Sequence, residues 1–155
     1  MNAEPETLAA LARLVRRERV AALGTLRGGA PNVSLVAYLA ASDFSAFWLR
    51  VSRLAWHTQD LQRDARVSLA IAEGDDGRPD PQTLMRVTIR GDASLPEEEP
   101  SSLKAEWIAR FPESRITFDL ADFGFWRIVP RDARFVAGLG RTFNLSAADL
   151  AACAH

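Results

Sequence analysis

Four polar side chains with the chemistry of an anion site stand close together within residues 47–61. Ser52 and Arg53 supply a hydroxyl and a guanidinium, and His57 and Thr58 follow with an imidazole and a second hydroxyl. Hydroxyl and guanidinium groups bind phosphate oxygens, and the free N–H groups at the start of a helix favour the same negative charge. This spacing predicts an anion site, above all one for phosphate.

The elements that would position these residues follow from two periodicities. Apolar and polar residues alternate from Phe47 through Leu49 to Val51, which is typical of a strand. From Ser52 onward, apolar residues return at helical spacing, and serine is a common N-cap residue. The residues at helical spacing are Leu54, Ala55, Thr58 and Leu61. A strand that runs into a helix capped by Ser52 would gather the four polar side chains.

Composition limits the class of protein. The chain has 155 residues, 48% of them hydrophobic and 25% charged, which predicts one soluble domain over residues 1–155. Its net charge of −1 argues against nucleic acid or a membrane surface as a partner, because both require a basic excess. No apolar run is long enough to span a bilayer, and the N-terminus lacks the pattern of a secretory signal. With Cys153 as the one cysteine, we expect a cytoplasmic protein.

Scarce residue types exclude several chemistries. Two histidines, His57 and His155, and one cysteine argue against a closed zinc site. The single lysine, Lys104, lies in a predicted surface helix, which argues against a Schiff base with pyridoxal phosphate. The sequence contains no dinucleotide-binding, P-loop or nucleophile-elbow motif.

The order of the predicted elements favours an α+β split β-barrel. A helix over about residues 5–18 precedes strands in meander order, and a second helix is expected at Glu97–Phe111. Ser146 with Asp149 resembles a capping box that opens a short last helix over about residues 146–153. We expect about six to seven mostly antiparallel strands of Greek-key type with flanking helices, and a bulge or corner at Gly91. The expected strands are Arg19–Leu26, Asn32–Ala40, Ser45–Val51, Ala65–Glu73, Thr83–Leu95, Asp122–Pro130 and Asp132–Gly138.

Each candidate residue also has a purely structural interpretation. A helix cap beside a surface charge explains Ser52 with Arg53, and a hydrogen bond to a backbone carbonyl explains His57. Arg86 and Arg90 share one strand face and suit a solvated surface as well as a ligand site. The residue types alone leave both interpretations open.

Residues 47–71 resemble the signature region of the pyridoxamine-phosphate-oxidase-like FMN-binding split-barrel proteins, and more narrowly their haem-utilisation branch. In that branch a segment S-x-L-A-x-H-T-x-N-L precedes a strand containing S-L. This chain matches the segment from Ser52 to Leu61, with Asp60 where asparagine is usual. The turn GLGRT at residues 138–142 is similar to the closing turn of the family, and the resemblance covers roughly residues 10–145.

The resemblance implies a homodimer with FMN at the dimer interface, and an FMN-dependent oxidoreductase whose substrate is unknown. By position, Ser52 and Arg53 would hold the FMN phosphate, and residues 33–36 would run along the isoalloxazine ring. Arg86 and Arg141 would reach the cofactor from other elements. The cofactor-binding residues expected in this way are Val33, Ser34, Leu35, Val36, Phe47, Trp48, Ser52, Arg53, His57, Thr58, Arg86 and Arg141.

Three alternatives remain open at this stage. The first is a haem-binding or haem-utilisation protein on the same fold, for which His155 is the only late histidine and therefore the candidate iron ligand. The second is a deazaflavin-dependent reductase. The third is a member that folds and dimerises without a cofactor. None of the residues stands out as a catalytic acid or base.

Overall fold

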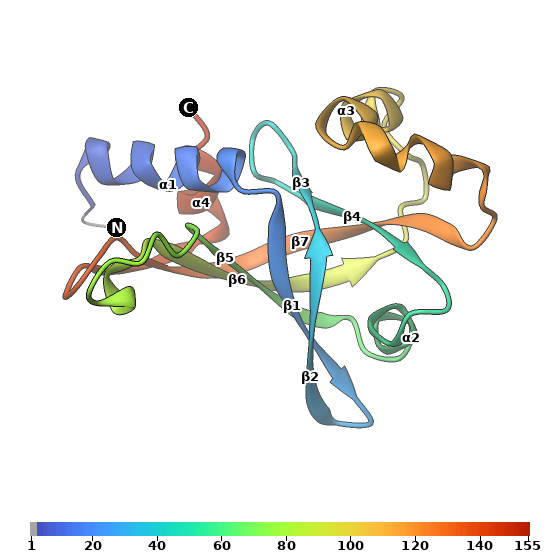
Figure 1. The fold of residues 1–155 in the computed structure, drawn as a ribbon, viewed down its shortest axis with the longest axis horizontal. Coiled ribbons are helices and arrows are strands. Elements are labelled where there is room, and N and C mark those ends of the chain that lie inside the picture. Colours follow the sequence, from blue (N-terminus) through green and yellow to red (C-terminus); the bar gives the residue numbers. More distant parts are fainter. Residues whose placement is uncertain (1–2) are drawn as a thin grey trace.

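A computed structural model describes residues 3–155 as one curled antiparallel sheet with helices around it (Figure 1). Along the sheet the strand order is β2-β1-β5-β6-β7-β4-β3, and β8 pairs with β7. The strands are β1 Val20–Arg27, β2 Ala30–Ala37, β3 Leu39–Ala40, β4 Phe47–Ser52, β5 Arg66–Ala72, β6 Arg86–Ser94, β7 Phe123–Val136 and β8 Thr142–Ser146. The helices are α1 Pro5–Arg17, α2 Trp56–Arg63, α3 Leu103–Arg110 and α4 Ala147–Ala152, with 3₁₀ turns η1 Pro81–Thr83 and η2 Pro112–Asp119.

The two ends of the sheet are joined by a single residue, Tyr38. β2 and β3 stand at opposite ends of the strand order but follow one another in the chain, so the sheet must curl until its ends meet. Tyr38 is fully buried, and its hydroxyl donates a hydrogen bond of 2.6 Å to the Val15 carbonyl at the end of α1. Burial raises the pKa of this phenol, which stays neutral. The α+β split barrel predicted from the sequence is confirmed.

Apolar side chains fill two separate clusters, one on each face of the sheet. The larger lies inside the barrel, where α1 contributes Leu11 and Leu14. The smaller lies outside, where Trp107 of α3 packs edge-on against Phe125 of β7, with ring centroids 5.6 Å apart. Because successive side chains of a strand point to opposite faces, β4 serves both clusters. Helix α3 thus covers the outer face over β4 and β7 (Figure 1).

Several expected boundaries were wrong, among them those of the strand Asn32–Ala40, which is divided at Tyr38 into β2 and β3. The two last predicted strands form one strand, β7, and β8 was missed because its glycine-rich turn suggested a loop. Glu97 does not start a helix, since Pro100 intervenes and α3 begins at Leu103. Residues 83–85 precede β6 rather than belonging to it. The capping box of Ser146 is present as predicted.

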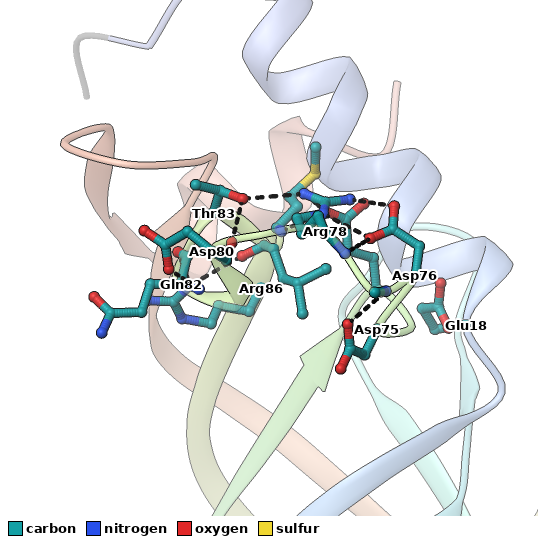
Figure 2. A network of polar contacts seen from close by, with 12 residues as sticks. Glu18, Asp75, Asp76, Arg78, Asp80, Gln82, Thr83 and Arg86 are labelled. Atoms are coloured by element: carbon teal, nitrogen blue, oxygen red, sulfur yellow. Dashed lines mark hydrogen bonds and ion pairs between the residues drawn. The ribbon is translucent and has the colours of Figure 1, made fainter.

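The loop between β5 and β6 is tied down by charge rather than loose. Arg78 makes ion pairs with Asp76 at 2.9 Å and with Glu73 at 3.1 Å, and Figure 2 shows its side chain beside Asp76 and Thr83. Glu73 also accepts a hydrogen bond of 2.7 Å from the Met85 N–H. These contacts hold the exposed loop against the base of β6. Within residues 3–155, no helix is long and apolar enough to cross a membrane.

A bulge in the β6–β7 pair lies where Gly91 was predicted to mark one. Arg90 pairs with Asp132 and Gly91 pairs with Pro130, so Arg131 has no partner on β6. A Cβ atom at position 91 would collide with the Val129 carbonyl oxygen, which explains why glycine stands there. Both Arg131 and Asp132 line a cleft on the outer face, although successive side chains normally alternate.

We expect Gly91→Ala to lower the free energy of unfolding by about 2 kcal/mol, because the adjoining backbone must move to admit the methyl group. Gly124→Ala is the matched control: it lies in β7, and a Cβ atom there would meet nothing within 4 Å. Urea denaturation followed by circular dichroism gives both values. Equal effects of the two substitutions would show that the bulge does not need glycine.

Candidate functional site

The junction between β4 and α2 differs from the capped helix start that the sequence predicted. The Ser52 hydroxyl accepts a hydrogen bond of 3.1 Å from the Leu54 N–H and donates one of 2.6 Å to the Asp122 carboxylate. Helix α2 begins only at Trp56, its N-cap residue is Ala55, and no side chain caps it. The prediction that Ser52 caps the helix was therefore wrong. Ser52 instead joins the end of β4 to the residue that precedes β7.

Asp60 anchors α2 to the β1–β2 hairpin. Only 1% of its surface is exposed, and its carboxylate accepts hydrogen bonds from the hydroxyl of Thr25 at 2.8 Å, the guanidinium of Arg27 at 2.9 Å and the amide of Asn32 at 3.2 Å. Burial alone would raise the pKa of Asp60, but these donors outweigh it, and the net shift is downward. The carboxylate is therefore ionised at neutral pH and holds three residues of the hairpin together.

Thr58 lies inside the protein, and His57 is half-buried with one ring nitrogen enclosed. Thr58 is fully buried, and neither its hydroxyl nor the Nε2 atom of His57 has a hydrogen-bond partner within residues 3–155. Burial lowers the pKa of His57, and the charge of Asp60 opposes that shift only in part. The imidazole is consequently neutral near pH 7. Neither residue lines a cleft on the outer face of the sheet.

The residues expected along the flavin ring fall into two groups. On β2, Val33 and Leu35 are 70% and 74% exposed, whereas Val36 points into the core and Ser34 is half-buried. Phe47 lies wholly inside the barrel, and Trp48 is packed beneath α3. Among these residues, only Val33 and Leu35 on the outer side of β2 present apolar surface to a ligand or a partner.

The two remaining arginines of the predicted set lie far from the β4–α2 junction. Arg86 donates to the backbone carbonyls of Gln82 and Leu84 at 2.8 and 2.9 Å, and Figure 2 shows it within the loop network at the base of β6. Arg141 donates a hydrogen bond of 2.8 Å to the hydroxyl of Thr7 on α1. Within one subunit, the structure does not bring these arginines together with Ser52 and Arg53.

Two adjoining clefts instead open on the outer face of the sheet. The larger cleft, of about 680 Å³, lies over β6, β7 and β8, and the smaller cleft, of about 360 Å³, lies between the β1–β2 hairpin and β5. They share Arg90 and Arg131. The larger cleft is lined by Thr88, Arg90, Arg131, Asp132, Ala133, Arg134, Asn144, Leu145 and Ser146. The smaller cleft is lined by Gly24, Thr25, Leu26, Pro31, Asn32, Val33, Arg66, Val67, Ser68, Arg90 and Arg131.

The charges of the larger cleft are predominantly positive. Three arginines and one carboxylate, that of Asp132, line it. Nε and Nη2 of Arg90 donate hydrogen bonds of 2.7 and 2.5 Å to the two oxygens of this carboxylate. The hydrogen bonds from Arg90 lower the pKa of Asp132, and burial opposes that shift without reversing it. Arg134 donates to the Asn144 side chain at 2.9 Å. Arg131 pairs with Asp92, outside the lining, at 3.2 Å. Two ion pairs therefore offset part of the charge, and Arg134 is the lining arginine that is left without a carboxylate partner among the described residues.

Comparison with known sequences now decides the family. The family described as pyridoxamine 5′-phosphate oxidase matches residues 7–137. The chain belongs to the pyridoxamine 5′-phosphate oxidase family. The membership predicted from the signature segment is confirmed, and the fold described above is the split barrel expected of it.

Several relatives in this family carry names that refer to haem. The chain is 35% identical over 116 residues to "Non-canonical heme oxygenase HOZ, chloroplastic" of Arabidopsis thaliana, which covers 74% of this chain and 34% of the relative. It is 26% identical over 132 residues to "Heme oxygenase HutZ" of Vibrio cholerae, covering 82% of this chain and 73% of that one. The solved structure of a heme binding protein from Mycobacterium smegmatis superposes with a TM-score of 0.81 at 28% identity, over 98% of this chain and 62% of that one. The chain spans about a third of the plant relative.

Sequence reasoning missed most residues of the two clefts. Arg131, Arg134 and Asn144 carry no motif, and Asp60 was noted only as a departure from the family segment. One signal was available: Arg86, Thr88 and Arg90 alternate with buried residues along β6, as the sequence predicted. What that pattern could not reveal is which charged residues of β7 and β8 lie beside them.

We expect Asp60→Asn to lower the free energy of unfolding by about 2 kcal/mol at pH 7, because charged hydrogen bonds of this kind are worth roughly 1.5–3 kcal/mol. The folded pKa of Asp60 lies below its ordinary value of 3.8, so its contribution is fully present above that pH and is lost as the pH falls through the folded pKa. The difference between wild type and variant should therefore shrink below about pH 4. Chemical denaturation from pH 7 to pH 3 measures it.

Asp64→Asn is the control for this experiment. Asp64 also pairs with an arginine, Arg66, but both side chains are accessible to solvent, and such pairs contribute little. A difference for Asp60→Asn that stayed constant down to pH 3 would contradict the role assigned to its charge.

Proposed function

We propose that this protein binds haem in the larger cleft on the outer face of its sheet. The observation that carries the proposal is the set of three arginines, Arg90, Arg131 and Arg134, around a cleft of about 680 Å³. Haem carries two propionate carboxylates, and the arginine fork matches a carboxylate bidentately. The names of the relatives from Arabidopsis thaliana, Vibrio cholerae and Mycobacterium smegmatis support haem as the ligand.

The same geometry disfavours FMN phosphate at the β4–α2 junction. The Ser52 hydroxyl already donates to the Asp122 carboxylate, and a negative charge beside the serine would repel a phosphate. The start of α2 lies four residues beyond Ser52, so its free N–H groups are not at the serine. FMN remains the second candidate because the family is named after an oxidase that acts on a phosphorylated substrate. The use of a deazaflavin as cofactor remains a prediction, and so does location in the cytoplasm.

The cleft residues would hold the propionates and orient the ring, and haem would supply iron-centred redox chemistry once bound. Among the described residues that line the two clefts there is no histidine, cysteine, methionine or tyrosine, so the iron ligand must come from elsewhere. Nε2 of His57 is buried. His155 is exposed but does not lie at the cleft: Ala154 beside it belongs to the apolar cluster inside the barrel, and its carbonyl accepts a hydrogen bond of 2.6 Å from Arg16 of α1. A ligand from a second copy or from solution would have to complete the iron site.

We also propose that two copies associate through the exposed side of β2 and the start of α2. Val33, Leu35, Leu54 and Trp56 are 63–77% exposed. Four large apolar residues on two neighbouring elements form the kind of surface that soluble proteins usually cover with a partner. Val33 also lines the smaller cleft, so a second subunit would lie beside the proposed ligand site.

Titration with hemin tests the main proposal. We expect saturable binding with a Soret band, and no comparable binding of FMN. Arg134→Gln should weaken hemin binding about fivefold, which corresponds to about 1 kcal/mol for a solvent-accessible ion pair. Arg63→Gln removes the same charge from the exposed end of α2, outside both clefts, and should bind as wild type does. A yellow protein that releases FMN and gives no Soret band would favour the second candidate.

His155→Ala and His57→Ala should both leave the Soret band of bound hemin unchanged, because neither imidazole lines a cleft on the outer face. A Soret band altered by His155→Ala would contradict the placement of His155 away from the cleft.

Leu35→Arg should dissociate the dimer, because a charge would be buried in an apolar contact. Leu139→Arg is the matched control, since Leu139 is 70% exposed in the turn before β8, away from the proposed contact. Light scattering coupled to size exclusion gives the mass of each form. A wild-type monomer, or an unchanged mass for Leu35→Arg, would contradict this contact.

A further inference from the structure

The smaller cleft differs from the larger one in the sign of its charges. Every charged residue that lines it is an arginine: Arg66 from β5, Arg90 from β6 and Arg131 from the bulge of β7. The larger cleft contains Asp132 as well. The carboxylates that pair with Arg66 and Arg131, namely those of Asp64 and Asp92, lie outside the lining. A ligand in the smaller cleft would therefore contact only arginines among the charged lining residues, each of which is paired with a carboxylate behind it: Asp64, Asp132 or Asp92.

The arginines of the smaller cleft keep donors for a ligand. A guanidinium has five N–H groups, and a carboxylate partner occupies at most two of them directly. The side chains of Arg66, Arg90 and Arg131 are 65%, 66% and 54% exposed, so each pair is solvated and contributes little in its present arrangement. Exchange of one carboxylate for another anion therefore has a small energetic cost.

Neutral hydrogen-bonding groups complete the walls. The Ser68 hydroxyl and the Asn32 amide line the cleft, and Asn32 is held in place by its hydrogen bond to Asp60. Gly24 lies opposite Ser68, and a Cβ atom there would stand 2.8 Å from the Ser68 hydroxyl oxygen. A glycine at this point keeps the floor clear and the hydroxyl accessible. The volume of about 360 Å³ suits a small molecule rather than a macrocycle.

We propose that the smaller cleft binds a small oxyanion with two negative charges, a phosphate or a compact dicarboxylate, and that this anion regulates the larger cleft. Arg90 and Arg131 belong to both clefts, so an anion that engages them in the smaller cleft withdraws positive charge from the larger one. Binding of the anion and binding of haem therefore oppose each other, and the effect is reciprocal. The regulatory part rests on the proposed haem function; the anion site itself does not.

Arg66 separates the two clefts experimentally, because it lines only the smaller one. Inorganic phosphate and succinate are titrated calorimetrically into the full chain without haem, at an ionic strength held constant with chloride. We expect at least one of them to bind, with affinity reduced about fivefold or more in Arg66→Gln and unchanged in Arg63→Gln. Binding of only one anion identifies the chemistry of the ligand. Failure of both to bind, or equal affinity in wild type and Arg66→Gln, overturns the anion site.

Regulation is tested by hemin titration with and without a saturating concentration of the anion that binds. In wild type, the anion should raise the hemin dissociation constant several-fold. In Arg66→Gln the hemin constant without anion should equal that of wild type, and about fivefold more anion should be needed for the same effect. If the anion leaves the dissociation constant of hemin for wild type unchanged, the proposed coupling is overturned. If hemin does not bind at all, the haem proposal fails while the calorimetric result on the smaller cleft still stands.

Discussion

The structure depends on a constraint of connectivity: the two edge strands of its sheet, β2 and β3, are joined through Tyr38 alone. A sheet tied in this way must curl, and its concave side then becomes a closed apolar interior sealed by α1. Buried side chains fill that interior, so no ligand can enter it without displacing them. Both clefts with clustered arginines consequently lie on the convex side, where α3 covers the start of β7 at Phe125 but not the part around Arg131 and Arg134.

The bulge at Arg131 converts this sheet surface into a candidate site. In a regular strand Arg131 and Asp132 would point to opposite faces, and one of the two charges would enter the core. The bulge allows both to face outward, and it is possible because Gly91 lets the Val129 carbonyl approach β6 closely. The glycine that relieves strain in the fold therefore also sets the spacing of charges between the two clefts.

Local patterns in the sequence predicted local structure well and long-range contacts poorly. The alternation of residue types along β6 correctly predicted which of its side chains point outward. The capping box at Ser146 is also present as expected. Ser52 was misassigned because its hydroxyl partner, Asp122, lies 70 positions further along the chain. The spacing of residue types within one element cannot reveal a contact between residues so far apart in the chain. The expected fold was correct because the family resemblance supplied the long-range pairings, such as β1 with β5 and β4 with β7, that alternation within one strand does not specify.

The signature segment around α2 thereby acquires a different physical role from the one its residue types suggested. Its buried charged group is the Asp60 carboxylate, which accepts a hydrogen bond from Asn32, a residue that also lines the smaller cleft. An uncompensated buried carboxylate would be costly, so Thr25, Arg27 and Asn32 must stay in place around it. Helix α2 therefore acts on the candidate site indirectly, by fixing the hairpin that forms one of its walls.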